Sequence, residues 1–334
     1  MQVLGDLAQG MTLRFHQSRI KSEMGQLSSE IATGQVRDQG KRVSGDFRQL
    51  AGIQHSLTRL EAYRTATTEA SQIADTLQTI LGRVQDNAQA LAAPLTNVAS
   101  STLPIIRETL ATEALDRLGT MISAINTQTA GRSYLSGTST DRSPLADVST
   151  LMNELRGAVS GQITAAGVIA ELDQWFDAPG GGFETIMYQG GTQHLASLRL
   201  GETETADITL RADDATFRKI LKNTALAALA TDATAALPTG LQSDLQRHAG
   251  EALLTVNDDI TGLRAKIGTL EARIEETSTR NAAEVSSLSQ ARNVLLEADP
   301  YETASRLEEV QYQLETVYAL TARSARLSLL EYLR

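Results

Sequence analysis

The stretch VNDDITGLRAKIGTLEARI, residues 256–274, decides the fold. Its apolar positions alternate at spacings of four and three, the heptad pattern of a helix that packs one face against a partner helix. These positions are Val256, Ile260, Leu263, Ile267, Leu270 and Ile274. Residues 239–299 contain no proline, so the sequence predicts a long helix over 256–295, with a shift of the heptad phase near 277–285.

A second amphipathic helix is predicted for residues 299–334. Pro300 is compatible with its first turn, because the first backbone N–H groups of a helix have no partner within it. The apolar face of this helix consists of Leu307, Val310, Leu314, Val317, Leu320, Leu327 and Leu330. We expect this face to form part of a helix-packing or subunit interface.

The N-terminal part of the chain shows the same pattern. Its apolar face is predicted to consist of Leu13, Ile20, Met24, Leu27 and Ile31. Glycines at 34, 40 and 45 predict a loop near residues 34–46, and a further helix is expected to end at about Pro94.

The middle of the chain is richer in glycine. Short runs bounded by glycines, at residues 184–189, 193–200 and 207–211, predict a small antiparallel sheet within residues 180–212. The expected fold is therefore mainly α: an antiparallel helical coiled-coil or bundle trunk built from both chain ends, with a small α+β insertion in the middle. The expected segments are assembly helices at 1–35 and 299–334, trunk halves at 36–140 and 241–298, and the insertion at 141–240.

Composition argues against several functions. The chain has 334 residues, a net charge of −10 and no cysteine. An acidic chain lacks the basic surface that binds nucleic acid, and no apolar run is long enough to insert into a membrane. The first ten residues lack the basic and apolar regions of a cleaved signal peptide. Nucleic-acid binding, membrane insertion and cleavable-signal export are thus not expected.

No motif for catalysis, a cofactor or a metal emerges. The four histidines lack the close spacing of zinc ligands, and the Gly34–Lys41 segment has the wrong length for a phosphate-binding loop. Paired carboxylates lie beside predicted apolar seams, where a solvated helix face is the usual role. We expect neither an enzyme nor a cofactor or metal site.

Three segments resemble the flagellin family, which includes the hook-associated proteins. Leu27–Gly34, with the sequence LSSEIATG, looks like the end of the family's first helix and the turn that follows. Gly131–Thr138 resembles a turn common in its junction proteins, and Asp299–Leu333 is similar to its terminal helix. The segment 41–48 departs from the family pattern.

The resemblance implies a structural subunit of the bacterial flagellum that joins hook to filament and polymerises through its terminal helices. It further implies a homo-oligomer that contacts other hook-associated proteins and flagellin, and that uses the flagellar export apparatus and a chaperone. The implied location is extracellular, in the flagellum.

Two alternatives remain open on the sequence. The first is a flagellin that forms the filament itself, because the helical architecture would be the same. The second is a secreted or scaffolding coiled-coil interaction protein, which the heptads alone would support.

Overall fold

The computed structural model describes the backbone of residues 2–98 and 103–332, and the side chains of residues 11–98 and 103–323. The chain divides into two compact units. One unit, called the terminal unit here, combines Met1–Glu61 with Ala282–Arg334, and the other, the central unit, is Ala62–Asn281. The mainly α fold predicted from the sequence is confirmed.

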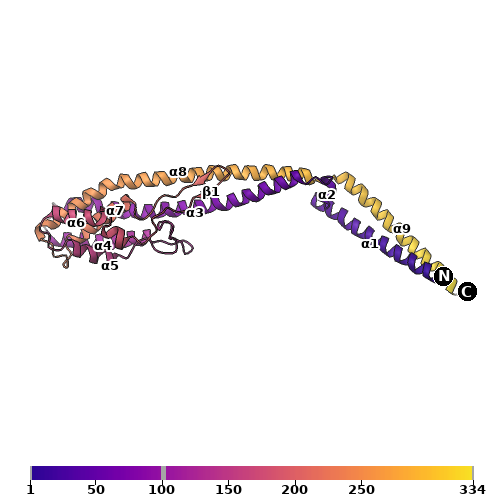
Figure 1. The fold of residues 1–334 in the computed structure, drawn as a ribbon, viewed down its shortest axis with the longest axis horizontal. Helices are drawn as coiled ribbons and strands as arrows, with labels where there is room; N and C mark the ends of the chain where they lie inside the picture. The colour runs from indigo at the N-terminus through magenta and orange to yellow at the C-terminus, as the bar shows by residue number, and fades with distance from the viewer. Residues whose placement is uncertain (1, 99–102, 333–334) are drawn as a thin grey trace. The chain divides into compact units, whose positions relative to one another are not determined.

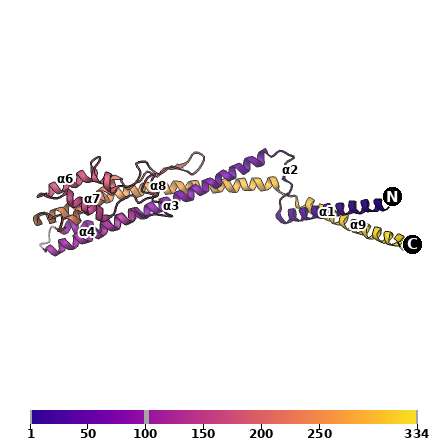
Figure 2. The ribbon, with the colours of Figure 1, turned by 60° about the horizontal axis from the view of Figure 1, so that its bottom comes forward.

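The terminal unit is built from paired helices. Its elements are α1 (Gln2–Thr33), α2 (Gln39–Arg42), the first part of α3 (Arg48–Asn97), the last part of α8 (Gln242–Leu296) and α9 (Pro300–Tyr332). Helices α1 and α9 lie side by side and antiparallel in both ribbon views (Figures 1 and 2). The predicted loop near 34–46 is present, but it contains the single-turn helix α2.

Backbone hydrogen bonds join the two turns of the terminal unit. Gly34 ends α1 with a φ of 68°, a conformation that glycine adopts without steric cost. The Val36 amide donates to the Leu296 carbonyl at 2.9 Å, and the Ala298 amide donates to the Gly34 carbonyl at 3.0 Å. The turn after α1 and the turn before α9 are therefore tied to each other.

Asp299 caps α9 at its N-terminus. Its carboxylate accepts from the amides of Tyr301 and Glu302 at 2.9 and 3.1 Å. Pro300 occupies the first position of the helix, where its missing N–H costs nothing. The sequence predicts this helix start correctly.

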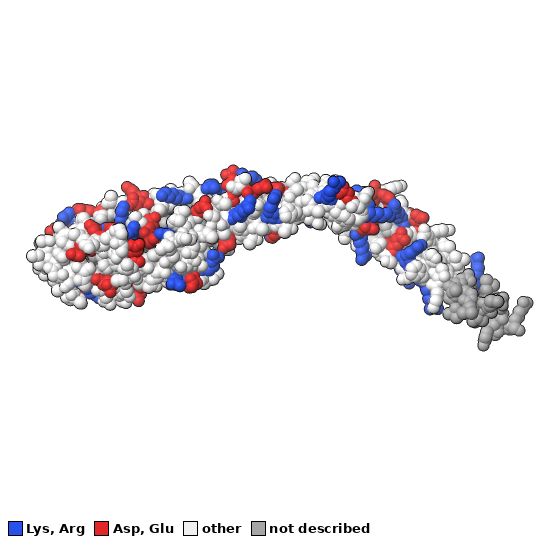
Figure 3. All heavy atoms as spheres, in the orientation of Figure 1, with Lys and Arg blue, Asp and Glu red and all other residues white. Residues whose placement is uncertain are grey.

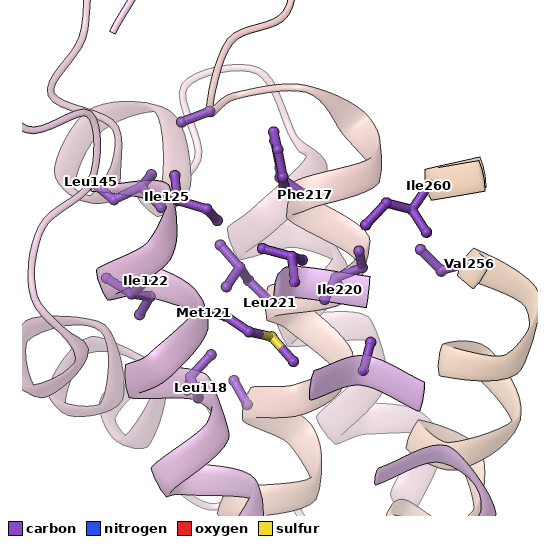
Figure 4. Packing of buried hydrophobic residues seen from close by; sticks show 14 of the residues in the cluster. Leu118, Met121, Ile122, Ile125, Leu145, Phe217, Ile220, Leu221, Val256 and Ile260 are labelled. Atoms are coloured by element: carbon purple, nitrogen blue, oxygen red, sulfur yellow. The ribbon is translucent and has the colours of Figure 1, made fainter. Parts of the chain in front are cut away.

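The central unit packs shorter helices beside the rest of α3 and α8 (Figures 1 and 2). These helices are α4 (Pro104–Ile125), α5 (Val148–Ala158), α6 (Ala165–Asp177) and α7 (Ala215–Leu229). In the core, Met121 of α4 points toward Leu221 of α7, and Ile260 approaches from α8 (Figure 4). Since these side chains are almost completely buried, they anchor the short helices to the long ones.

The predicted sheet is smaller than the sequence suggests. It consists of β1 (Leu198–Arg199) and β2 (Thr205–Ala206), paired antiparallel. The run at 184–189 is not a strand, because Phe183–Met187 forms a π-helical turn. Phe183 and Met187 are both buried, and this spacing of four places them on one helical face.

Two predicted helix limits are also wrong. Helix α3 continues through Pro94 to Asn97, since the fully buried Leu91 and Leu95 hold this last turn against the core. Helix α8 begins at Gln242 rather than at Val256, and it continues unbroken to Leu296. The predicted shift of the heptad phase therefore lies within one helix. Its 55 residues give a length of about 80 Å at about 1.5 Å per residue.

Candidate assembly surface

Among the described side chains, the face shared by α1 and α9 contains a small apolar cluster. Ile20 and Leu27 of α1 and Val310 of α9 are its buried members. Met24, Leu307, Leu314 and Val317 are partly buried around them. Helices of 32 and 33 residues therefore rest on few buried side chains within the described part of the pair.

The remaining predicted residues of these two helices lie at the margins of the cluster. Leu13 is partly buried. Ile31 and Leu320 are 43% and 49% exposed, so they contribute little to packing within one chain. Ile31 is exposed because it lies at the end of α1, where α9 has only just begun. The side chains of Leu327 and Leu330 lie outside the described residues.

The predicted face of α8 packs inside the central unit. Val256, Ile260, Ile267 and Ile274 are buried in its core. Leu263 and Leu270 are partly buried against the same core. These residues hold the chain's own helices together, so they are not free to contact another subunit.

A polar layer crosses from α3 to α8 within this apolar packing. The Gln85 amide nitrogen donates to Asn257 Oδ1 at 2.9 Å and to Thr261 Oγ1 at 3.1 Å. Arg264 donates to Gln85 Oε1 at 2.7 Å. Gln85 is only 8% exposed, so these bonds form in one helix register and would be lost in another.

The outward faces of α1 and α9 carry bulky side chains that sequence analysis missed. Met11 and Phe15 on α1 are 68% and 72% exposed, and Tyr301 and Tyr312 on α9 are 84% and 72% exposed. Met11 precedes Ile20, and Tyr301 precedes Val310, by two and a half helical turns. The sequence does carry a signal for this surface: large apolar residues that lie on the opposite side of the helix from the heptad seam.

One side-chain pair connects the edges of α1 and α9. The Lys21 ammonium lies 5.7 Å from the centre of the Tyr318 ring, within the range of a cation–π interaction. Hydrogen bonds from Lys21 and Gln17 lower the pKa of the Tyr318 hydroxyl. Both side chains are well exposed, so the pair aligns the helices more than it stabilises them.

The central unit has a groove of about 470 Å³ between α6, α7 and α8. Lys222 at its edge pairs with Asp173 and Asp177, both at 2.6 Å. Burial opposes the charge on Lys222, but these two hydrogen bonds outweigh it and raise its pKa. Lys219 pairs with Asp259 at 2.9 Å, so the lysines of this groove are engaged in structural ion pairs.

The described residues offer no grouping of three or more His, Asp or Glu side chains suited to a metal ion. Within the same residues, no helix has an apolar stretch long enough to cross a membrane. Acidic and basic side chains are interspersed on the face drawn in Figure 3. The outward faces of α1 and α9 are therefore the strongest candidate for a functional surface.

Comparison with known proteins places these features in a family context. Residues 251–333 match the family described as "Bacterial flagellin C-terminal helical region". This match confirms the resemblance for the C-terminal part of the chain. Comparison with the curated proteins found no match.

Solved structures that share the fold include the following two. One is a putative flagellar hook-associated protein from Vibrio parahaemolyticus, with a TM-score of 0.51, 12% identity, and coverage of 73% of this chain and 94% of that one. The other is FlgL from Bacillus cereus, with a TM-score of 0.53, 15% identity, and coverage of 73% and 100%. At these identities the likeness concerns the fold.

Proposed function

We propose that this chain, which ends in a flagellin C-terminal helical region and has the fold of hook-associated proteins, is a structural subunit that joins the flagellar hook to the filament. It polymerises through α1 and α9. The proposal assigns the chain no catalytic activity.

The small seam between α1 and α9 is the observation that carries this proposal. Only three described side chains, Ile20, Leu27 and Val310, are buried there. A long amphipathic helix gains most of its stability from packing. The described part of this pair packs sparsely on the inside, while Phe15 and Tyr312 are exposed on the outside. Contacts between subunits supply the missing burial, so that folding of the terminal helices is coupled to assembly.

The proposed partners follow from this role. Copies of the chain contact one another, and the assembly contacts other hook-associated proteins on one side and flagellin on the other. The chain reaches this place through the flagellar export apparatus, held by a chaperone before export, and works outside the cell. The family likeness of residues 251–333 supports this part of the proposal.

A deletion strain tests the function. Without a junction protein, cells build hooks but release unpolymerised flagellin into the medium, and electron micrographs show hooks without filaments. Expression of the full chain restores the filaments. Abundant filaments made of this chain would instead assign it as the flagellin, and filaments that persist without it would refute both assignments.

Truncation tests the role of the terminal helices. We expect a chain lacking residues 1–20 and 315–334 to lose assembly, because the α1–α9 seam is shortened at the end remote from Gly34. The central unit should keep its helical circular dichroism and cooperative unfolding, since its core uses none of the deleted residues. Unchanged incorporation into flagella would show that these helices are not the assembly elements.

A further inference from the structure

The outward faces of α1 and α9 differ in charge as well as in position. On α1, Met11, Arg14 and Phe15 share one face, because they are spaced at i, i+3 and i+4. On α9, Glu308, Tyr312 and Glu315 share one face at i, i+4 and i+7. We call the first set the α1 patch and the second the α9 patch. The α1 patch is basic and apolar, and the α9 patch is acidic and aromatic.

The two patches point away from each other in one chain. Ile20 and Val310 pack in the same cluster between the helices, so the residues about half a turn away lie on opposite outer sides of the pair. In the described part of the chain, Arg14, Glu308 and Glu315 make no ion pair. Among the described residues, therefore, neither patch has an ion-pair partner of opposite charge.

We propose that the α1 patch of one copy binds the α9 patch of the next copy. This pairing covers Phe15 and Tyr312, which are each 72% exposed, and brings Arg14 against Glu308 and Glu315. This inference rests on the proposed function, because it identifies the contact between neighbouring copies in the proposed assembly. Each added copy leaves one α1 patch and one α9 patch free, as growth into a ring or tube requires.

Charge argues against the symmetric alternatives. A two-fold contact between α1 patches would place Arg14 beside its own copy, and a contact between α9 patches would gather four carboxylates. Like charges that face each other across an interface oppose association. Only the pairing of unlike patches combines apolar burial with opposite charge.

Cysteine cross-linking tests the pairing, because the chain has no natural cysteine. Full-length chains with Phe15→Cys and with Tyr312→Cys are expressed together in the deletion strain, and their isolated flagella are oxidised. We expect a disulfide-linked species of twice the 35.9 kDa chain mass, containing one copy of each variant. Each variant expressed alone should give none.

A matched control uses Thr112→Cys in place of Tyr312→Cys, since Thr112 is exposed on α4 of the central unit. A mixed cross-link no stronger than this control, or dimers from one variant alone, would overturn the pairing. If flagella still form in either case, the proposed function stands while the pairing fails. If filaments persist in the deletion strain itself, the proposed function fails.

If a chain that carries a cysteine substitution does not enter flagella, a charge exchange tests the pairing of the two patches instead. We expect Arg14→Glu alone to reduce the amount of the chain in flagella, and Arg14→Glu combined with Glu308→Arg and Glu315→Arg to restore it. All these residues lie on the surface, so the exchange leaves the α1–α9 seam unchanged. Failure of the combined variant to recover would contradict the pairing.

Discussion

Gly137 lies at a position of the central unit where the backbone leaves no room for a side chain. Its φ is 60°, and an added Cβ would collide with the carbonyl oxygen of Gln193 and come within 2.9 Å of that of Gly191. Nearby, the Tyr188 hydroxyl donates to the Gly191 carbonyl at 2.8 Å, and burial and then Asp213 raise the Tyr188 pKa to about 12. The backbone at Gly137 is thus packed closely against the backbone of residues 191–193.

We therefore expect Gly137→Ala to destabilise the central unit by about 2–4 kcal/mol, from strain at positive φ together with the clash. Gly131 is the matched control, because its φ is 75° but nothing lies within 4 Å of an added Cβ. Gly131→Ala should cost only about 1 kcal/mol. Urea unfolding followed by circular dichroism measures both, and equal losses would contradict the account.

Asp232 provides a pH-dependent contribution to stability. Its carboxylate accepts from Arg156 at 2.8 Å and from the amides of Thr234 and Ala235 at 2.8 and 3.0 Å. Burial opposes its charge, but these hydrogen bonds outweigh burial and lower the pKa of Asp232. The stabilisation is therefore complete above the unfolded pKa, near 4, and is lost as pH falls through the lower folded value.

Asp232→Asn should cost about 1–3 kcal/mol at pH 7, because the Asp232 side chain is only 13% exposed and its partners lose a charged acceptor. Since the wild-type chain loses this contribution in acid, the difference between the two proteins should shrink below pH 4. Asp141→Asn, at a side chain that is 78% exposed, is the control and should change little. A pH-independent difference would contradict this role.

At the scale of single elements, the polar layer between α3 and α8 specifies how the two helices align. Gln85→Ala should cost about 1–3 kcal/mol, because Asn257 and Arg264 each lose a hydrogen-bond partner in a largely buried seam. Gln54→Ala is the control at an exposed position of α3. Chemical denaturation monitored by circular dichroism would show the difference, and equal midpoints for both variants would exclude a role for the layer.

The helices could be predicted from the sequence because each long seam repeats over many residues. Val256–Ile274 repeats its heptad without a break, and the observed helix contains the whole stretch. The Phe183–Met187 turn was misread as part of a strand, since one pair of apolar residues at a spacing of four is too short a pattern to separate helix from strand.

The assembly surface was predictable only in part. Heptad spacing finds Ile20, Leu27 and Val310, which are buried between α1 and α9. It does not find Phe15 or Tyr312, because a seam search looks for in-phase residues and these two lie on the opposite face. The polar layer could not be predicted for a related reason. Gln85 interrupts an apolar face, and a glutamine there is interpreted as solvent-exposed unless its partners on α8 are known.

At the scale of the whole molecule, the two units have different roles in the proposed function. The central unit has a large buried core of its own, whereas the described part of the α1–α9 pair is held by a small cluster. We expect the isolated chain to unfold in two steps as temperature rises, with the terminal helices melting first. Hydrogen exchange followed by mass spectrometry would locate the steps, and uniform protection along the chain would contradict the expectation.

The position of the protein in the flagellum tests the central claim most directly. Antibodies against the central unit, coupled to gold and applied to isolated flagella, would be viewed by electron microscopy. A structural subunit that joins hook to filament predicts gold in one narrow band at the hook–filament boundary. Gold along the whole filament, or its absence from the flagellum, would contradict it.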